Sequence, residues 1–329
     1  MSSRHDADIL ILGAGPAGCA AAISARQAGL RVMLVESLPE PRIAPGETLH
    51  PGVEVIFRQL GVWEKIVAER FHRHVGVWKE SADKIHFEAY GADEQGSWLG
   101  IQAERKRLHR ILQGAAVEIG CPILRSTTPC EVLKESARVV GVATDRGEFR
   151  ARWVLDATGN RSWLAEALGL PAETKSPRAR VGFGWKESGP KEADGQPRFR
   201  QYANGWDWLA PQGNWRSAWV RLRFLGSLEE TTTQGGGMAC TWRIHRLCSG
   251  AGYMLLGDAA ALLDPGASNG VLRALMSGIY ATYLIMQSNQ GRIDECSIIR
   301  TYAEWVGDWF DHHSKELGRV YFSTIGLQQ

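Results

Sequence analysis

The sequence predicts an α/β fold, in which a parallel sheet with helices is joined by a second, discontinuous domain of mainly antiparallel sheet and by C-terminal helices. Three observations predict it. An apolar strand, a glycine turn and a helix follow one another at 7–27, apolar strands end near an acidic residue within 152–159 and 253–260, and 216–224 alternates apolar with polar side chains. With 44% hydrophobic and 22% charged residues over 329 positions, the chain has the composition of a folded globular protein.

The first unit contains a glycine turn between the apolar run 7–12 and the small-residue stretch 19–27. Gly13 permits a tight turn, Gly15 lets the backbone approach a pyrophosphate, and Gly18 lets the helix lie close to the strand. Unpaired N–H groups at the helix N-terminus favour phosphate binding. The unit is therefore typical of a Rossmann-like domain that binds a dinucleotide.

The next strand ends at an acidic residue with the spacing that such a domain requires. Gly29 follows the helix as a C-terminal glycine does, 30–35 is apolar, and Glu36 comes next. A carboxylate about 20 residues after the glycine turn binds a ribose hydroxyl. We therefore predict that Glu36 binds the ribose, with an exposed strand-end glutamate as the alternative.

Two later stretches indicate which dinucleotide binds. Asp156 and Gly159 follow one apolar strand, and Gly257 and Asp258 follow another about a hundred residues on. With these motifs, nearly the whole chain resembles the p-hydroxybenzoate-hydroxylase-like FAD superfamily, which includes aromatic monooxygenases, flavin-dependent halogenases and geranylgeranyl-reductase-like proteins. The resemblance implies FAD as the cofactor, with Asp258 at its ribityl chain.

The resemblance also implies how the flavin ring is held. Pro265 and Gly266 break the chain before a helix whose first N–H groups, near Asn269, point at the flavin N1–C2=O edge. Gln102 and Arg105 match the family's Gln-x-x-Arg motif, although a solvated helix face is an alternative for the arginine. The predicted cofactor-binding residues are Gly13, Gly15, Ala17, Gly18, Glu36, Arg42, Gln102, Arg105, Asp156, Gly159, Gly257, Asp258, Pro265, Asn269, Gly270 and Val271.

The resemblance implies that the FAD domain is discontinuous. We assign 1–70, 100–175 and 240–293 to the FAD-binding domain, 71–99 and 176–239 to a substrate-binding sheet domain, and 294–329 to a C-terminal helical segment. Six of the 13 tryptophans fall in 185–242. Trp206, Trp208 and Trp219 are predicted to line a substrate pocket on the sheet that covers the flavin, with packing in the core as the alternative.

The implied reaction is hydroxylation of an aromatic, indole-like substrate through a flavin C4a-hydroperoxide. Thr241, Trp242 and Arg243, together with 269–278, resemble the flavoprotein oxygenases of tryptophylquinone biogenesis, so a Trp in a partner polypeptide is a candidate substrate. Halogenation, alkene reduction of the geranylgeranyl-reductase type, and a non-catalytic FAD-binding partner protein stay open, because fold alone does not choose among them.

Two residues are predicted to be catalytic, and both lie on the loop that the resemblance places across the flavin. His50 is the candidate acid/base because imidazole titrates near neutrality, and a structural hydrogen bond is the alternative for it. Glu47 is a lesser candidate, for ordering the loop. For halogenation, Lys79 is the tempting catalytic lysine, but the spacing places that position nearer His72 or Arg73. Electrons are expected from NAD(P)H, directly or through a separate flavin reductase.

Charge and hydropathy limit the other partners. The net charge of +2 and the lack of a basic patch interleaved with aromatics predict no nucleic-acid partner. The six scattered cysteines predict reduced thiols and no metal site. Since the N-terminus lacks a secretion signal and no apolar run approaches the roughly 20 residues of a membrane span, we expect a cytoplasmic protein.

Overall fold

The first of two large sheets contains the Rossmann-like unit. The computed structural model describes residues 5–41, 46–81, 83–213, 215–225 and 238–325. This mixed sheet has eight strands, ordered β10-β2-β1-β13-β12-β11; in addition β22 pairs with β13, and β21 pairs with β22. The strands are β1 (Ala7–Leu12), β2 (Val32–Glu36), β10 (Ile123–Arg125), β11 (Pro129–Glu135), β12 (Arg138–Thr144), β13 (Gly147–Asp156), β21 (Ser249–Gly250) and β22 (Tyr253–Leu255).

The strands that end at the cofactor motifs are parallel neighbours. β1 pairs with β2 on one side and with β13 on the other, and β22 pairs with β13. Because carboxyl ends of parallel strands meet at one edge of a sheet, the segments after β1, β2, β13 and β22 converge there. The predicted α/β fold class is confirmed.

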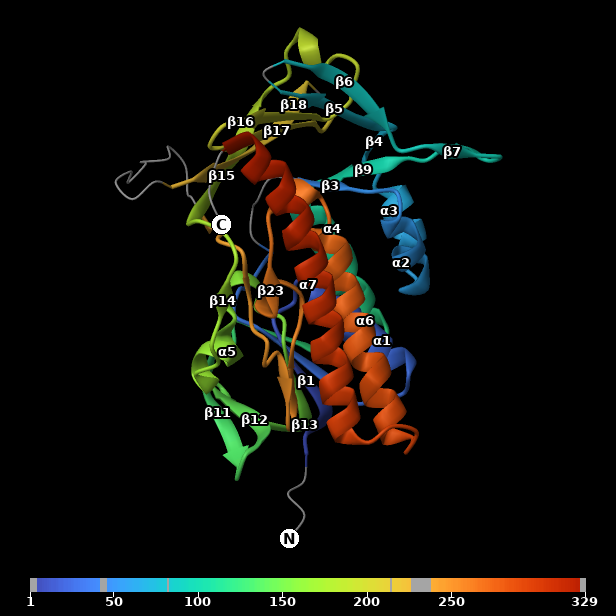
Figure 1. Cartoon of the computed structure of the whole chain (residues 1–329). Coiled ribbons are helices and arrows are strands. Elements are labelled where there is room, and N and C mark those ends of the chain that lie inside the picture. Colours follow the sequence, from blue (N-terminus) through green and yellow to red (C-terminus); the bar gives the residue numbers. More distant parts are fainter. Residues whose placement is uncertain (1–4, 42–45, 82, 214, 226–237, 326–329) are drawn as a thin grey trace.

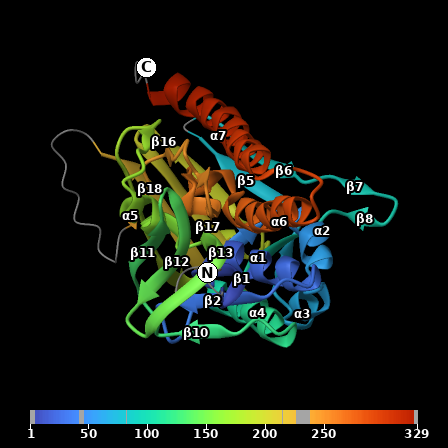
Figure 2. The same cartoon turned by 90° about the horizontal axis from the view of Figure 1, so that it is seen from below.

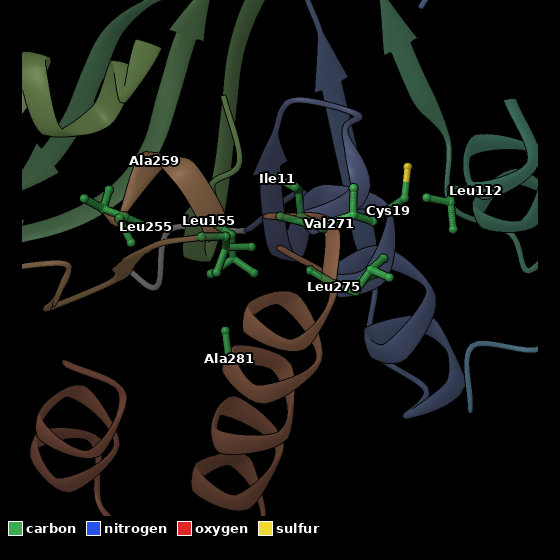
Figure 3. Close-up of a cluster of buried hydrophobic side chains, with 14 of the residues drawn as sticks. Ile11, Cys19, Leu112, Leu155, Leu255, Ala259, Val271, Leu275 and Ala281 are labelled. Atoms are coloured by element: carbon green, nitrogen blue, oxygen red, sulfur yellow. The ribbon is translucent and has the colours of Figure 1, made fainter. Parts of the chain in front are cut away.

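Helices cover this sheet and form the core with it. The helices are α1 (Pro16–Gln27), α2 (Val53–Gln59), α3 (Trp63–Ala68), α4 (Arg105–Glu118), α5 (Trp163–Leu168), α6 (Gly270–Asn289) and α7 (Glu295–Ile325), with 3-10 turns η1 (Gly159–Arg161), η2 (Pro190–Glu192), η3 (Gly257–Ala259) and η4 (Pro265–Ala267). Buried side chains from β1, α1, α4, β13, β22 and α6 meet in one cluster (Figure 3). A Cβ on Gly278 of α6 would lie 2.4 Å from the Ala17 carbonyl oxygen of α1, so only glycine allows these helices to pack so closely.

A second, seven-stranded sheet lies beyond the carboxyl edge of the first (Figure 1). We call it the roof sheet. Its strands, in the order β19-β15-β18-β17-β16-β5-β6, are β5 (Gly76–Glu80), β6 (Ile85–Ala89), β15 (Ala179–Glu187), β16 (Arg198–Tyr202), β17 (Gly205–Pro211), β18 (Arg216–Phe224) and β19 (Met238–Ala239). All its pairings are antiparallel except β16 with β5, and Leu222 and Phe224 of β18 are buried as the alternation predicted.

Smaller sheets connect the two large ones. β9 lies between β3 and β4, β20 lies between β14 and β23, and β7 with β8 forms a hairpin that projects from the body (Figure 1). These strands are β3 (Glu47–Leu49), β4 (His72–His74), β9 (Gly100–Ala103), β7 (Ala92–Asp93), β8 (Gly96–Ser97), β14 (Glu173–Thr174), β20 (Arg243–Ile244) and β23 (Ala261–Leu262).

The C-terminal helix α7 runs beside α6 and reaches the roof sheet (Figures 1 and 2). This helix lies in the predicted C-terminal helical segment and packs into the core, where Ile298, Tyr302 and Phe310 are fully buried. No helix in the described ranges is long and apolar enough to cross a membrane. The roof sheet takes its strands from 76–89 and 179–239, and the predicted domain boundaries stay a prediction.

Candidate active site

The glycine turn after β1 is shaped by two close backbone contacts and one open position. Gly13 has φ +100°, and a Cβ there would lie 2.6 Å from the Ala157 carbonyl oxygen. A Cβ on Gly18 would lie 2.0 Å from the Gly13 carbonyl oxygen. Nothing lies within 4 Å of a Cβ on Gly15. The first two glycines let the backbone close, whereas Gly15 leaves free space at the N-terminus of α1, where a phosphate binds.

Glu36 lies at the end of β2 with its carboxylate over this turn. One carboxylate oxygen accepts the Ala14 N–H at 2.8 Å, and the other accepts the Leu38 N–H at 2.8 Å. A carboxylate offers about four acceptor positions, so each oxygen can still accept a ribose hydroxyl. The side chain therefore fixes the turn, and its binding of the ribose stays a prediction.

Asp156, at the end of β13, uses its side chain within the protein. Its two carboxylate oxygens accept the Thr158 N–H at 2.8 Å and the Leu164 N–H at 2.7 Å. The residue is fully buried, and this burial raises the pKa of its carboxyl. We infer that Asp156 acts through the shape of the turn that leads to Gly159, whose φ is +65°.

Asp258 lies in η3, after Gly257 has turned the chain with φ +54°. The Gly257 N–H donates to Ser277 Oγ of α6 at 2.9 Å, which fixes η3 against that helix. The Asp258 side chain is half-buried, with no hydrogen bond to another described residue, and it faces the charges of Arg243 and Arg273. It is thus free to accept hydrogen bonds from hydroxyl groups.

Arg273 lies near Asp258 and was not among the residues predicted from the sequence. Burial lowers the pKa of its guanidinium to about 10.

Asp264 links the loop before α6 to two distant elements, and the sequence analysis did not single it out. Its Oδ1 accepts the Gly266 N–H at 2.7 Å and the Trp206 Nε1–H of the roof sheet at 3.0 Å. Its Oδ2 accepts the Tyr321 hydroxyl of α7 at 2.7 Å. Burial raises the pKa of this carboxyl to about 6. Its position directly before Pro265 was the available signal, since aspartate commonly begins a helical turn.

Trp208 is attached to the loop 46–52 by a second hydrogen-bonded chain. Its Nε1–H donates to Thr48 Oγ1 at 2.8 Å, and the Thr48 hydroxyl donates to Gln102 Oε1 at 2.8 Å. Gln102 is 1% exposed, and its Nε2 has no hydrogen-bond partner among the described residues. A buried amide nitrogen without a partner indicates a ligand acceptor at that place.

These segments enclose a cavity of about 100 Å³ between the roof sheet and the loop before α6. Trp206 and Trp208 lie two residues apart on β17 and therefore share one face of the sheet. Indole rings form part of one wall, and the first residues of α6 form part of another. The lining residues are Gly46, Glu47, Thr48, Leu49, Trp206, Trp208, Val220, Pro265, Ser268, Gly270 and Val271. Asn269 lies between lining residues as the N-cap of α6.

Trp219 does not line this cavity, which corrects the prediction that it belongs to the same pocket. It pairs with Leu209 on β17, whereas Val220 pairs with Trp208. Because successive side chains of a strand point to opposite faces, Trp219 lies on the other face of the roof sheet. There its ring borders Gly184 and lies 5.8 Å from the Arg221 guanidinium.

The two predicted catalytic residues differ in position. Glu47 lines the cavity, and its carboxylate lies 3.3 Å from the guanidinium of Arg105 at the start of α4. The His50 ring is absent from the cavity lining; it packs edge-on against Tyr90 at 5.0 Å, and its Nδ1 accepts the Gly52 N–H. Burial lowers the pKa of His50. Arg42 lies outside the described residues.

The structure also shows where the three residues considered for the halogenase lysine position lie. Lys79 forms an ion pair with Glu88 on the neighbouring strand. His72 Nε2 lies 2.6 Å from the Gly195 carbonyl oxygen, and the Arg73 guanidinium lies over the Trp63 ring. None of these three side chains lines the cavity, and no lysine is among the lining residues named above.

A larger groove of about 550 Å³ lies elsewhere. It is bordered by the C-terminal end of α1, which includes Ser24 and Gln27, by α2, and by α6 and α7. The glycine turn lies at the opposite end of α1. This groove is therefore separate from the converging cofactor motifs.

These residues fit the phosphates and hydroxyl groups of FAD. There is open space at Gly15, Glu36 and Asp258 offer carboxylates, and the Gln102 amide nitrogen has no partner among the described residues. The fold and site define a dinucleotide-binding flavoprotein. The chain belongs to the family described as FAD binding domain, which matches residues 6–190. The predicted p-hydroxybenzoate-hydroxylase-like superfamily and FAD cofactor are confirmed, and the protein is an FAD-dependent oxidoreductase.

Two curated relatives have similar sequences. The 1H-pyrrole-2-carbonyl-(peptidyl-carrier protein) chlorinase of Pseudomonas fluorescens is 23% identical, and the match covers 87% of this chain and 77% of the chlorinase. The digeranylgeranylglycerophospholipid reductase of Thermoplasma acidophilum is 21% identical, and the match covers 92% of this chain and 84% of the reductase. Relatives with such different activities do not identify the reaction.

Two solved structures have the same fold. The flavin-dependent brominase Bmp2 superposes with a TM-score of 0.84 at 21% identity, covering 97% of this chain and 88% of that chain. Pseudomonas aeruginosa PqsL, in complex with 2-aminobenzoylacetate, superposes with a TM-score of 0.82 at 16% identity, covering 98% and 97%. At these identities the likeness establishes the fold alone.

Proposed function

We propose that this protein is an FAD-dependent monooxygenase that hydroxylates an aromatic, indole-like substrate. The observation that carries the proposal is that Trp206 and Trp208 line the same cavity as Pro265, Gly270 and Val271, the predicted flavin-binding residues. Both indole N–H groups donate inside the protein, to Asp264 and Thr48. Their rings therefore offer a flat ligand apolar and aromatic surface rather than hydrogen bonds.

The cavity residues have separable roles in this reaction. When bound and reduced, FAD supplies the chemistry of oxygen activation, halide oxidation or hydride transfer. The Gly270 and Val271 N–H groups at the start of α6 are placed to stabilise negative charge. Leu49, Val220 and the two indoles exclude water from the reacting centre. Glu47, paired with Arg105, is the ionisable residue of the lining and is proposed to order the loop or accept a proton.

A Trp side chain within a partner polypeptide is proposed as one form of the substrate. An indole ring fits walls made of indole rings, and PqsL was solved with an aromatic ring compound. Free indole-like small molecules are the other form. NAD(P)H is proposed as the electron source, directly or through a flavin reductase.

Halogenation is the second candidate, favoured by the similarity to the Pseudomonas fluorescens chlorinase and to Bmp2. We place hydroxylation first because none of the described residues that line the cavity is the lysine expected of a halogenase. Alkene reduction is supported by the similarity to the Thermoplasma reductase. The rigid aromatic wall fits a ring better than a flexible isoprenoid chain.

Product mass distinguishes the three reactions. FAD-loaded protein is supplied with NADH or NADPH and a flavin reductase, oxygen, chloride or bromide, and either an indole derivative or a Trp-containing peptide. We expect one added oxygen atom, a gain of about 16 mass units, coupled to oxygen consumption. A halogen isotope pattern would establish halogenation instead. Addition of two hydrogens to an alkene substrate, without oxygen consumption, would establish reduction.

Electron supply is tested without oxygen. Protein containing oxidised FAD is mixed with NADH or NADPH while flavin absorbance is followed. Bleaching that requires an added flavin reductase supports a two-component system. Prompt bleaching by the purified protein alone would establish direct reduction.

A further inference from the structure

We propose that Thr48 is a positioning residue for the cofactor: by accepting from Trp208 and donating to Gln102, it turns the Gln102 amide so that its N–H groups face FAD. The inference concerns the cofactor site and does not depend on which reaction the protein catalyses. It identifies a residue on the cavity wall that transmits the position of the roof sheet to the cofactor.

The direction of each hydrogen bond follows from the chemistry of the groups. An indole nitrogen only donates, so Thr48 Oγ1 must accept from Trp208 Nε1 at 2.8 Å. The threonine hydroxyl has one proton, which points to the Gln102 side chain 2.8 Å away. The Gln102 atom at this distance is Oε1, which only accepts, so the threonine hydroxyl donates to it.

Because Oε1 of the Gln102 amide accepts from Thr48, the nitrogen Nε2 is left as a hydrogen-bond donor. Gln102 Nε2 is buried and has no partner among the described residues. Gln102 lies on β9 directly across from Thr48 on β3, and the following helix begins at Arg105. A buried donor without a partner is costly unless a ligand accepts from it, and FAD offers carbonyl, hydroxyl and phosphate oxygens.

Thr48 also belongs to the cavity, because it lines the wall beside Trp208. Displacement of the Trp208 indole frees the hydroxyl to rotate and accept from Gln102, which allows the amide to turn over. The Thr48 hydroxyl thus connects Trp208, in the cavity wall, with the Gln102 amide that is proposed to donate to FAD. Coupling between two sites is reciprocal, so a ligand that moves this indole changes FAD affinity, and FAD changes the affinity for that ligand.

Equilibrium binding of FAD to apoprotein, followed by flavin fluorescence, tests the proposal. Thr48→Val keeps the shape and removes the hydroxyl, so we expect the dissociation constant to rise roughly threefold to tenfold, as for one lost hydrogen bond. Thr48→Ser restores the hydroxyl and should bind FAD within about twofold of the wild type. Thr282→Val is the matched control, because its buried hydroxyl donates to the Ala21 carbonyl oxygen between α6 and α1.

Two further variants test the amide itself. Gln102→Leu removes the donor, and the double variant with Thr48→Val should bind FAD no more weakly than Gln102→Leu alone, since both changes act through one group. Trp208→Phe keeps Thr48 intact and should give an intermediate loss of FAD affinity. This variant replaces Thr48→Val in the test if Thr48→Val does not fold. Wild-type affinity in Thr48→Val, equal losses in Thr48→Ser and Thr48→Val, or additive losses with Gln102→Leu would each overturn the proposal.

Discussion

The Tyr321 hydroxyl donates a 2.7 Å hydrogen bond to Asp264 Oδ2, although the two residues lie 57 positions apart in the chain. Tyr321 belongs to the last turns of α7, and Asp264 precedes the loop that leads into α6. Trp206 of the roof sheet donates to the other oxygen of the same carboxylate. One buried carboxylate therefore holds the C-terminal helix, the roof sheet and the cofactor loop together.

This relationship predicts a pH-dependent stability difference. The folded pKa of Asp264 is raised from 3.8 to about 6, so its burial destabilises the fold progressively as pH rises between these values. The Tyr321 hydrogen bond lowers this pKa, so Tyr321→Phe should raise it further. We expect Tyr321→Phe to cost about 1–3 kcal/mol at pH 8 and less at pH 5, measured by denaturant unfolding.

The control is Asp264→Asn, which removes the titrating group. The other titratable groups that face Asp264 are Tyr321 and Cys240, whose pKa values are raised by burial, so both stay neutral. The difference in stability between Asp264→Asn and the wild type should change between pH 4 and 6 and then level off. An equal cost of Tyr321→Phe at pH 5 and pH 8 would contradict this account.

Substitution of two glycines of the first turn is predicted to affect different properties, stability for Gly18 and FAD affinity for Gly15. Gly18→Ala places its Cβ 2.0 Å from a backbone oxygen, so we expect it to destabilise the fold by several kcal/mol. Gly15→Ala meets free space and should unfold like the wild type but bind FAD more weakly, because the methyl group enters the phosphate position. Thermal unfolding and FAD titration check the pair. A Gly15→Ala variant with unchanged FAD affinity would place the phosphates elsewhere.

Glu36 is predicted to bind FAD through its charge as well as to fix the glycine turn. Glu36→Gln keeps one acceptor for the Ala14 N–H but turns its amide NH2 toward the Leu38 N–H, so the fold should lose about 1–2 kcal/mol of stability. The change also weakens hydrogen bonds to ribose hydroxyls, so FAD affinity should fall about tenfold. Glu40→Gln is the control, because Glu40 contacts only Arg110 at the surface in the described structure. The measurement is FAD titration in parallel with unfolding. A Glu36→Gln loss confined to stability would leave it a purely structural residue.

The two faces of the roof sheet are predicted to respond differently to loss of an indole. Trp206→Phe removes part of the cavity wall and a bond to Asp264, so the KM for an aromatic substrate should rise about tenfold or more. Trp219→Phe, on the opposite face, should leave KM within about twofold of the wild type. Steady-state kinetics with the aromatic substrate that the product-mass experiment identifies provides the comparison. Equal effects of both variants would show that the cavity is not the substrate site.

The His50 acid/base assignment stays a prediction, and its pH dependence can be stated. Burial lowers the pKa of His50 below 6.5, so the ring is neutral at pH 7 and could accept a proton. If it is the base, kcat/KM should fall as pH drops below that pKa, and His50→Gln should remove this limb with a loss of roughly 100-fold. His74→Gln is the control, since His74 is buried against Tyr90 and outside the cavity lining. An unchanged profile in His50→Gln would disprove the assignment.

Much of the fold follows from local pattern. The apolar run 7–12 is β1, the predicted strand at 216–224 is β18, and the helical stripe after 294 is α7. These predictions succeeded because the hydrophobic periods of strands and helices depend on residues that are close together in the chain. The glycine turn, Glu36, and the segment 264–271 were also recognisable, because each carries its own backbone or charge requirement.

The prediction for Trp219 failed for a reason that the sequence itself contained. Val220, Leu222 and Phe224 alternate with Trp219 along β18, so a pocket that includes Val220 excludes Trp219. Residue type suggested a shared role, whereas position along the strand decided the face. His50 shows the same limit, because its loop could be predicted but the direction of its ring could not.

The sequence by itself determined the FAD-binding framework, since glycine turns, strand-end carboxylates and helix starts depend on residues close together in the chain. Only the tertiary structure decided that Tyr321 and Trp206 meet at Asp264, and that Trp208 reaches Gln102 through Thr48. These partners lie 54 to 160 residues apart. Their meeting depends on how sheets and helices pack, and a packing arrangement leaves no periodic signal in a single chain.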